Sequence, residues 1–491
     1  MTFASSSPSS RSSSSSIPSA NPNRWKALSI LSLAQFLIIL DTSIIGVALP
    51  TIQEHFSITQ TDLQWIFNAY VITFGTLLLL GGKLSDIVGQ RKIFAIGFLI
   101  LTGSSVLAGL APSNDVLILG RILQGLGAAL IAPAALSIVM NLFLSNRSEM
   151  NKAMGIWGAA APAGGTAGVF LGGIITAWLD WPWVFLINVP IGIMVLVLIP
   201  KLIPAGIKKK GNIDYLGALS ITGSLALMIY SIVTANEIEG GWFSVQTVSM
   251  LVTSFALLGA FFVIEKRRKE PLIPLQIFKT PNLLSSNIVM ALLGAAWVSM
   301  WFFLNLYLQQ ILHYGPLESG LALLPMTGLI MVMMVWAMPT LIGKLGIKGN
   351  LITGLGLLTL GLVLFSFTPA NSSDGSNYVF LVYVLPASII SALGMSFSYI
   401  PILISAISKA KNEESGIASG LVNTTYQLGS ALGLAIMVSV STVHYEYLTS
   451  SGANIIVALN DGFHLSFIGA AIISAIAAIT AVSFIKTKSD E

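Results

Sequence analysis

The stretch ALSILSLAQFLIILDTSIIGVAL, residues 27–49, is almost wholly apolar and carries a single charge, the carboxylate of Asp41. A helix of about 20 apolar residues is long enough to cross the hydrocarbon core of a bilayer. A charge held in hydrocarbon is costly unless it is paired, hydrated or neutralised. The stretch therefore predicts a membrane-spanning helix with a carboxylate in its middle that needs an explanation.

The composition of the whole chain places it in the same class. Of its 491 residues, 55% are hydrophobic and only 9% are charged, which is too apolar for a soluble protein. It has no cysteine, so disulfides, thiolate metal sites and cysteine nucleophiles are excluded. No phosphate-binding loop, metal-ligand cluster or nucleophile–base pair stands out, so we expect no enzyme activity, no cofactor, no metal and no nucleic-acid partner.

Apolar segments recur along the chain after a Ser-rich tail, residues 1–23, which we expect to be disordered and cytoplasmic. Fourteen segments have the length of a membrane span, which predicts an all-α polytopic membrane protein. The predicted spans are Ala27–Leu49, Leu63–Leu80, Ile93–Leu110, Val116–Phe143, Ala153–Trp178, Val184–Ile203, Tyr215–Ala235, Phe243–Ile264, Leu283–Gln309, Leu317–Ile342, Gly349–Phe367, Tyr378–Ile407, Gly416–Ser441 and Phe463–Ile485.

The loop charges orient these spans, because cytoplasmic loops are rich in Lys and Arg. Basic residues follow the even-numbered spans, as in Lys208–Lys210, whereas the alternate loops carry acids and no Lys or Arg. The only basic residue assigned to the membrane is Arg121. We therefore expect both termini to be cytoplasmic, in a cell (plasma or inner) membrane.

The chain also repeats itself. Ala153, Gly155, Gly164 and Gly168 match Ala418, Gly420, Gly429 and Gly433 at one constant offset. Internal repeats of this kind build transporters whose substrate site lies near the bilayer midplane. We expect a six-helix half at residues 24–203, two inserted helices at 204–280, a second six-helix half at 281–485 and a cytoplasmic C-terminus at 486–491.

Six stretches in order carry a family resemblance. They are LDTSIIGVALP (40–50), GKLSDIVGQRK (82–92), RILQGLGAA (121–129), GGTAGVFLGG (164–173), WPWVFLINVPIG (181–192) and GLVNTTYQLGSALG (420–433). Together they resemble the fourteen-helix drug:proton antiporter branch of the major facilitator superfamily. The resemblance implies a multidrug efflux transporter that exports amphipathic small molecules in exchange for protons, by alternating access. The alternatives are a proton symporter or facilitator that imports a small solute and, third, an integral-membrane enzyme.

The loop after the second span is a candidate conformational motif. Gly82 and Gly89 are expected to permit a tight turn, and Asp86 can pair with Arg91 or Lys92 in one conformation. A solvated hairpin that only fixes topology explains these residues equally well. Ile87 and Gln90 stand where the family pattern has basic residues, which predicts a weaker latch.

Glycines in the fifth span form the second part of the predicted motif. Gly164, Gly168 and Gly172 share one helix face, where another helix can approach closely, and Gly173 follows them. Packing alone also explains this pattern. The family associates it with antiport, but Val169 stands where the family pattern has a proline.

The two charges inside the membrane are the candidate coupling site. Asp41 and Arg121 lie at similar depths in their spans and are predicted partners. They form either a permanent structural ion pair or, with Gln124, a proton-coupling site in which Asp41 alternates between its protonated and ionised forms. An organic cation would have to compete with the proton at Asp41.

Softer candidates line the predicted substrate cavity, although most such side chains in membrane helices only pack or contact lipid. We expect the partners to be a small-molecule substrate, protons and the lipid bilayer. We expect the protein to be a monomer. The candidates are Trp65, Asn68, Tyr70, Asn305, Tyr307, Asn423, Tyr426 and Gln427.

Overall fold

The computed structural model describes residues 22–143, 147–205, 214–235, 238, 241–268, 271–273, 275–370, 376–407 and 415–486. Most of the predicted tail, the basic run 208–210 and residues 487–491 lie outside these ranges. The described residues form helices and no β-strand, which confirms the all-α prediction. The first helices are α1 (Arg24–Phe56), α2 (Gln60–Val88), α3 (Gln90–Gly109), α4 (Asn114–Phe143), α5 (Arg147–Trp178), α6 (Trp183–Leu186) and α7 (Asn188–Leu202).

The rest of the chain continues in the same way. Its α-helices are α8 (Tyr215–Thr234), α9 (Val245–Arg267), α10 (Leu283–Leu306), α11 (Pro316–Val332), α12 (Met338–Phe365), α13 (Ser376–Val379), α14 (Leu385–Ile407), α15 (Ser415–Ser450) and α16 (Ile455–Phe484). Short 3₁₀ turns are η1 (Gly241–Phe243) and η2 (Leu275–Lys279), and π-helical turns are η3 (Tyr307–Ile311), η4 (Met333–Ala337) and η5 (Phe380–Val384).

Polar residues set several helix starts. Thr59 and Asp62 form a capping box at α2, in which the amide of Asp62 donates to Thr59 Oγ1 at 3.1 Å and the amide of Thr59 donates to Asp62 Oδ2 at 3.2 Å. Asp214 caps α8 through a bond from the amide of Gly217 at 2.9 Å. These side chains satisfy amide groups that the first helical turn leaves without partners.

The number of spans fits the predicted fourteen only roughly and does not confirm it. Among the described residues, 12 helices are long and apolar enough to cross a membrane, and α2 adds another if its two parts, which meet at 51°, form one span. The shorter α11 is also apolar. Gly346, with φ 68°, breaks α12 between the tenth and eleventh predicted spans. The count of fourteen therefore stays a prediction.

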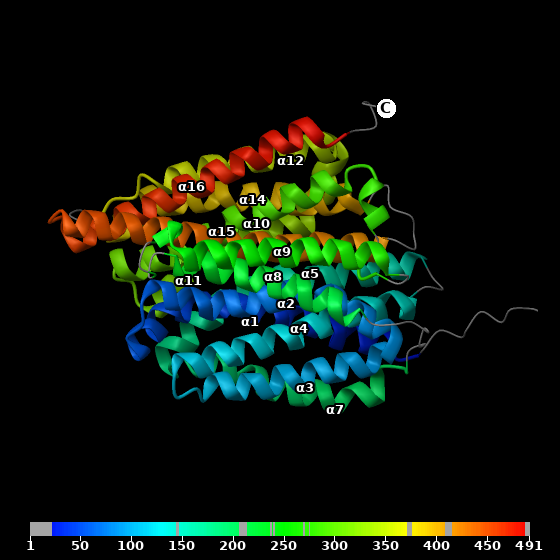
Figure 1. Cartoon of the computed structure of the whole chain (residues 1–491). Coiled ribbons are helices and arrows are strands. Elements are labelled where there is room, and N and C mark those ends of the chain that lie inside the picture. The colour runs from blue at the N-terminus through cyan, green and yellow to red at the C-terminus, as the bar shows by residue number, and fades with distance from the viewer. Residues whose placement is uncertain are drawn as a thin grey trace, which may run out of the picture.

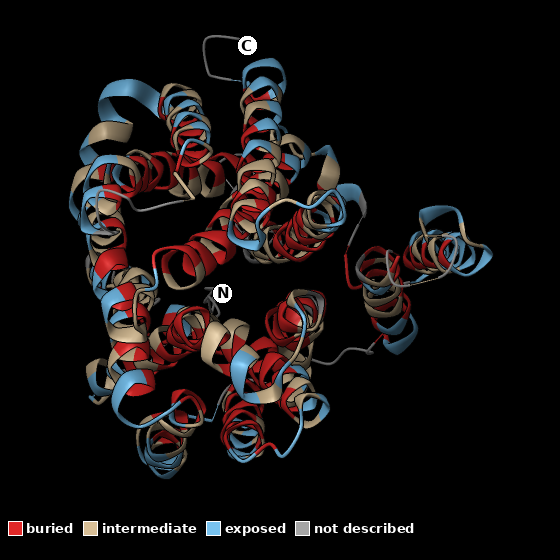
Figure 2. Cartoon of the chain, turned by 90° about the vertical axis from the view of Figure 1, so that its left-hand side faces the viewer, coloured by how far each residue is buried: buried red, intermediate tan, exposed pale blue. Residues whose placement is uncertain are grey.

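The helices run side by side and form two groups with a pair set apart (Figures 1 and 2). In one group α1 packs on α5, and α2 and α3 pack on α4; in the other, α10 packs on α15 and α16, and α12 packs on α14 and α16. The groups meet where α5 contacts α11 and where α2 contacts α15. The separate pair is α8 and α9, in which α8 contacts both α2 and α15. The predicted residue boundaries of the halves stay a prediction.

Glycines allow the closest helix contacts in both groups. A methyl group at Gly168 or Gly172 would lie 2.9 Å from a backbone oxygen of α1, and one at Gly164 would overlap another such oxygen. In the second group, methyl groups at Gly429 and Gly433 would overlap the backbone of α10. The predicted close approach is confirmed, and the repeated glycines pack against corresponding helices of the two groups.

The predicted role of Gly82 in a tight turn is wrong. Gly82 lies inside α2, which continues as a helix to Val88, and a methyl group there would meet only Pro133, at 3.6 Å. The chain turns instead at Gly89, whose φ of 110° is a conformation that side-chain-bearing residues rarely adopt. The neighbouring Gly81 allows α2 to approach α4 closely, because a methyl group there would overlap the carbonyl oxygen of Ala129.

Candidate functional site

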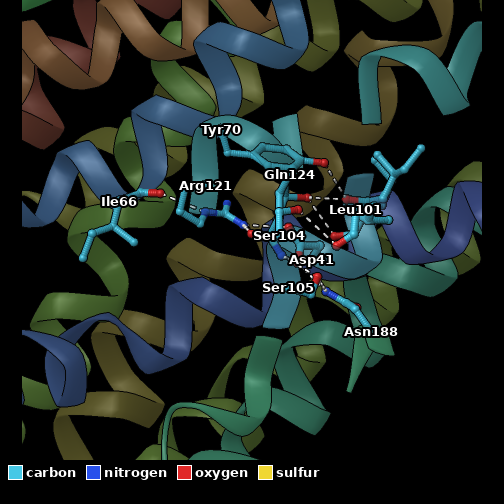
Figure 3. A network of polar contacts seen from close by, with 12 residues as sticks. Asp41, Ile66, Tyr70, Leu101, Ser104, Ser105, Arg121, Gln124 and Asn188 are labelled. Atoms are coloured by element: carbon cyan, nitrogen blue, oxygen red, sulfur yellow. Dashed lines mark hydrogen bonds and ion pairs between the residues drawn. The ribbon is translucent and has the colours of Figure 1, made fainter. Parts of the chain in front are cut away.

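Asp41 lies in the middle of α1 and is paired with Arg121 of α4 (Figure 3). The Arg121 Nη1 atom donates to Asp41 Oδ2 at 2.6 Å, and neither side chain is exposed to solvent. The structure thus brings together the two residues that the sequence analysis predicts to be partners. Their role in proton coupling stays a prediction.

The second oxygen of the carboxylate accepts two amide donors. Asp41 Oδ1 receives Asn188 Nδ2 at 2.7 Å and Gln124 Nε2 at 3.2 Å. Both amide nitrogens also donate to Ser105 Oγ, at 3.4 and 2.9 Å respectively. The predicted Gln124 therefore joins the site, and so do Ser105 of α3 and Asn188 of α7, which the sequence analysis missed (Figure 3).

Arg121 is held on several sides by groups of its own helix bundle. Its Nε donates to the carbonyl oxygen of Ile66 at 3.0 Å, and Nη1 also donates to Gln124 Oε1 at 2.9 Å. The guanidinium carbon lies 4.4 Å from the centre of the Tyr70 ring and 5.9 Å from that of Phe185, within the range of cation–π attraction. The charge of Arg121 is thus stabilised by groups beside Asp41 as well as by Asp41 itself.

The arrangement suits an ionised carboxylate shut away from water. Asp41 accepts three hydrogen bonds, and its neighbours Arg121, Gln124, Ser105 and Asn188 are all buried. Taking a proton would leave one carboxyl oxygen as a donor, so these bonds must rearrange. All these groups come from the first part of the chain, from α1, α3, α4 and α7, and not from the contacts between the two helix groups. A substrate cation cannot reach Asp41 in this conformation.

Three of the predicted cavity residues are occupied elsewhere. Tyr70 covers Arg121, and its hydroxyl donates to Ile38 O at 3.4 Å. The ring of Trp65 packs 6.0 Å from that of Tyr230 on α8. Tyr307 is buried and donates to Pro369 O at 3.0 Å. These three side chains face different neighbours, and their place in one substrate cavity stays a prediction.

Residues on α15 form a second cluster with α14 and α2. Asn423 accepts a bond from the Tyr399 hydroxyl at 3.3 Å, and the Tyr426 ring packs edge-on to that of Tyr399, 5.6 Å away. Gln427 lies against Gly75, where a methyl group would come within 2.7 Å of its Cβ. This cluster combines aromatic faces with amide groups at a contact between the two helix groups.

Two predicted asparagines lie deep in the helix bundle. Asn305 donates to Trp301 O at 2.8 Å, and both residues lie against Gly46 of α1. Asn68 is fully buried, and neither its Oδ1 nor its Nδ2 has a hydrogen-bond partner among the residues that the structure describes. Buried amides without partners are rare, so Asn68 is a candidate for contact with a polar ligand group.

A cavity of about 460 Å³ lies at the end of the bundle opposite the two termini. It is formed between α1 and the segment from η3 to α11, where the two groups face each other, and it contains none of the predicted cavity residues. Its lining residues are Pro50, Thr51, Gln53, Glu54, Gln309, Gln310, Tyr314 and Pro316.

The conformational motif joins α2 and α3 to other segments. Lys83 Nζ donates to Pro271 O at 3.2 Å, in the segment after α9, and Arg91 Nη1 donates to Ile203 O at 3.3 Å, after α7. The pairing of Asp86 with Arg91 or Lys92 stays a prediction.

Comparisons with known proteins agree on one family. The family model described as Major Facilitator Superfamily matches residues 31–434. The puromycin resistance protein pur8 of Streptomyces alboniger is 33% identical over 88% of this chain and 85% of its own length. The lincomycin resistance protein of Streptomyces lincolnensis is 32% identical over 85% and 84%, and the multidrug resistance protein Stp of Mycobacterium tuberculosis is 30% identical over 85% and 76%.

Solved structures share the fold at low sequence identity. The POT family transporter PepTSo superposes with a TM-score of 0.67 at 16% identity, covering 93% of this chain and 98% of its own. A bacterial homologue of the human lysosomal transporter Spinster, in an inward-facing and unoccupied conformation, gives 0.66 at 16% identity over 94% and 98%.

Proposed function

Because the chain belongs to the Major Facilitator Superfamily, we propose that it exports amphipathic small molecules or drugs in exchange for protons, by alternating access. Relatives named for drug resistance and export, including a cephamycin export protein of Amycolatopsis lactamdurans, support drug efflux. The observation that carries the proton part is the buried carboxylate of Asp41 beside Arg121, at 2.6 Å. Ionisable residues inside membranes are costly, and they commonly mark proton relays and substrate pathways.

In the proposed cycle Asp41 takes a proton on one side of the membrane and releases it on the other. The ionised form is stabilised by Arg121 and two amides, as in this conformation. Protonation removes the charge that Arg121 pairs with, so the bonds joining α1 to α4 and α7 weaken together. That change gives the proton a means to bias how α1 packs, and α1 also lines the contact between the two helix groups.

Alternating access is supported by contacts at the end opposite the termini. Gln309 Nε2 donates to Val47 O at 3.0 Å, and Gln310 Nε2 donates to Gln53 Oε1 at 2.9 Å. Successive residues of an α-helix point about 100° apart. Here both glutamines lie in the π-helical turn η3 and reach the same helix, α1. We propose that this pair closes the external side and must separate for release.

A cross-link at this point is expected to stop transport. The chain has no cysteine, so Gln53→Cys with Gln310→Cys creates the only thiols. A cleavable dithiol-reactive linker should block efflux from vesicles, and cleavage should restore it, whereas either single variant treated alike should transport. Mass spectrometry verifies that the cross-link has formed. Full transport by the cross-linked protein would contradict an external closure at these residues.

Transport in proteoliposomes tests the proposed function directly. With puromycin or lincomycin as the probe, an imposed proton gradient should drive accumulation, and adding the compound should move protons in the opposite direction. Proton movement in the same direction as the compound would indicate a symporter. If the compound only equilibrates across the membrane, without accumulating and independently of the proton gradient, the protein is a facilitator.

A further inference from the structure

Asn188 has a bonding pattern that differs from that of the other groups around Asp41. Its Nδ2 donates to Asp41 Oδ1 at 2.7 Å, which is the shorter of the two amide bonds to the carboxylate. Its Oδ1 is buried and has no hydrogen-bond partner in the described part of the chain. Asn188 itself is 1% exposed, so water does not meet that need at the surface. The site thus contains an unused acceptor next to a carboxylate.

A protonated Asp41 would need such an acceptor. Its new O–H group is a donor, and Arg121 offers only donors. Gln124 Oε1 already accepts a bond from Arg121 Nη1, and Ser105 Oγ already accepts bonds from two amides. Asn188 Oδ1 is the acceptor in this group that no donor occupies, and a half-turn of the amide about its last side-chain bond would bring it to Asp41.

We propose that Asn188 is the positioning residue that follows the protonation of Asp41. It donates through Nδ2 to the carboxylate, and after the amide turns it accepts through Oδ1 from the carboxylic acid. This inference rests on the proposed proton coupling and assigns it a second residue. Because Asn188 is the first residue of α7, after the short helix α6, the exchange links the charge on Asp41 to the junction of these helices.

The other groups that face Asp41 do not replace this function. The titratable or charged ones are Arg121 from α4 and Tyr70 from α2. Ser105 from α3 and Gln124 from α4 are neutral, and α5 faces α1 with glycines. The Ser105 and Tyr70 hydroxyls can each donate or accept, but Ser105 Oγ already accepts from two amides and the Tyr70 hydroxyl donates to Ile38 O. The amide of Gln124 is fixed at both ends by Arg121 and Ser105.

Two substitutions of nearly equal size separate this role from simple packing. Asn188→Asp keeps acceptors but removes the donor, and adds an acid beside Asp41, so the pair should keep a proton to higher pH. We expect the pH at which gradient-driven transport is half-maximal to rise by about one unit or more. Asn188→Leu removes both functions and should lower the number of protons moved per substrate. Asn287→Leu, at another buried asparagine on α10, is the matched control and should change neither.

Difference infrared spectroscopy distinguishes failure of this inference from failure of the proposed function. The carbonyl band of protonated Asp41 is identified by its loss in Asp41→Asn. It should appear on acidification of the wild-type protein and shift in frequency in both Asn188 variants. A band that appears but is the same in all proteins, with unchanged pH profiles, would overturn the role of Asn188. Absence of any Asp41 band over the working pH range would overturn proton binding at Asp41 itself.

Discussion

Replacing Asp41 by asparagine is expected to abolish transport driven by a proton gradient and to destabilise the protein. Asparagine cannot titrate, so it cannot carry a proton. Asp41 accepts bonds from three donors through two oxygens, whereas asparagine has one side-chain oxygen. The amide nitrogen of the asparagine would also face one of these donors. Arg121 would be left buried without its counter-charge, and breaking a buried ion pair in this way costs about 3–5 kcal/mol. Thermal unfolding in detergent and proteoliposome flux measure the two effects.

The double variant separates the structural role of the pair from proton coupling. Arg121→Gln added to Asp41→Asn removes the stranded cation, so stability should recover while gradient-driven transport stays absent. Asp115→Asn, an exposed acid in the first turn of the same α4, is the control and should behave as wild type. Recovery of coupled transport in the double variant would show that the pair only holds the fold together.

Gly164→Ala is expected to have the second large effect, on the packing of α1 against α5. Its methyl group would overlap the carbonyl oxygen of Phe36, which is backbone and cannot turn aside. The helices must move apart, and overpacking of this kind typically costs about 1–3 kcal/mol. The thermal unfolding temperature should fall, and transport should fall with it, because Asp41 lies on the same helix as Phe36.

The neighbouring glycine provides the matched control. A methyl group at Gly165 would lie 3.8 Å from its nearest neighbours, an ordinary contact, so Gly165→Ala should be nearly neutral. Gly429→Ala, against α10, should be as costly as Gly164→Ala, because it overlaps the carbonyl oxygen of Ala291. Equal unfolding temperatures for Gly164→Ala and Gly165→Ala would contradict the predicted helix contact.

The sequence predicted much of the fold because the forces that set it are local or periodic. Length and apolarity identify each span, and helical spacing puts Gly164, Gly168 and Gly172 on one face without knowledge of the partner helix. The error at Gly82 has a local cause as well. Glycine permits a turn without requiring one, and the helix continued until Gly89, whose backbone adopts the required conformation.

The site was only partly predictable, because sequence gives the depth of a residue in a span more readily than its direction. Depth and charge were enough to pair Asp41 with Arg121. The direction of the Tyr70 side chain, which places its ring over Arg121, could not be predicted in this way. Asn188 had a signal that was available, since it is the only carboxamide in residues 184–203, but nothing in its sequence neighbourhood indicates which of the other helices it faces.

The position of Asp41 also bears on how such a protein can acquire new cargo. The carboxylate and its partners belong to one part of the chain, whereas Asn305, Tyr426 and Gln427 lie at contacts involving the other. On the proposed mechanism, the site that binds the proton and the surface that binds the substrate are built from different residues. A lineage can therefore change the compounds it tolerates by substitutions at the shared contact, while inheriting its coupling to the proton gradient unaltered.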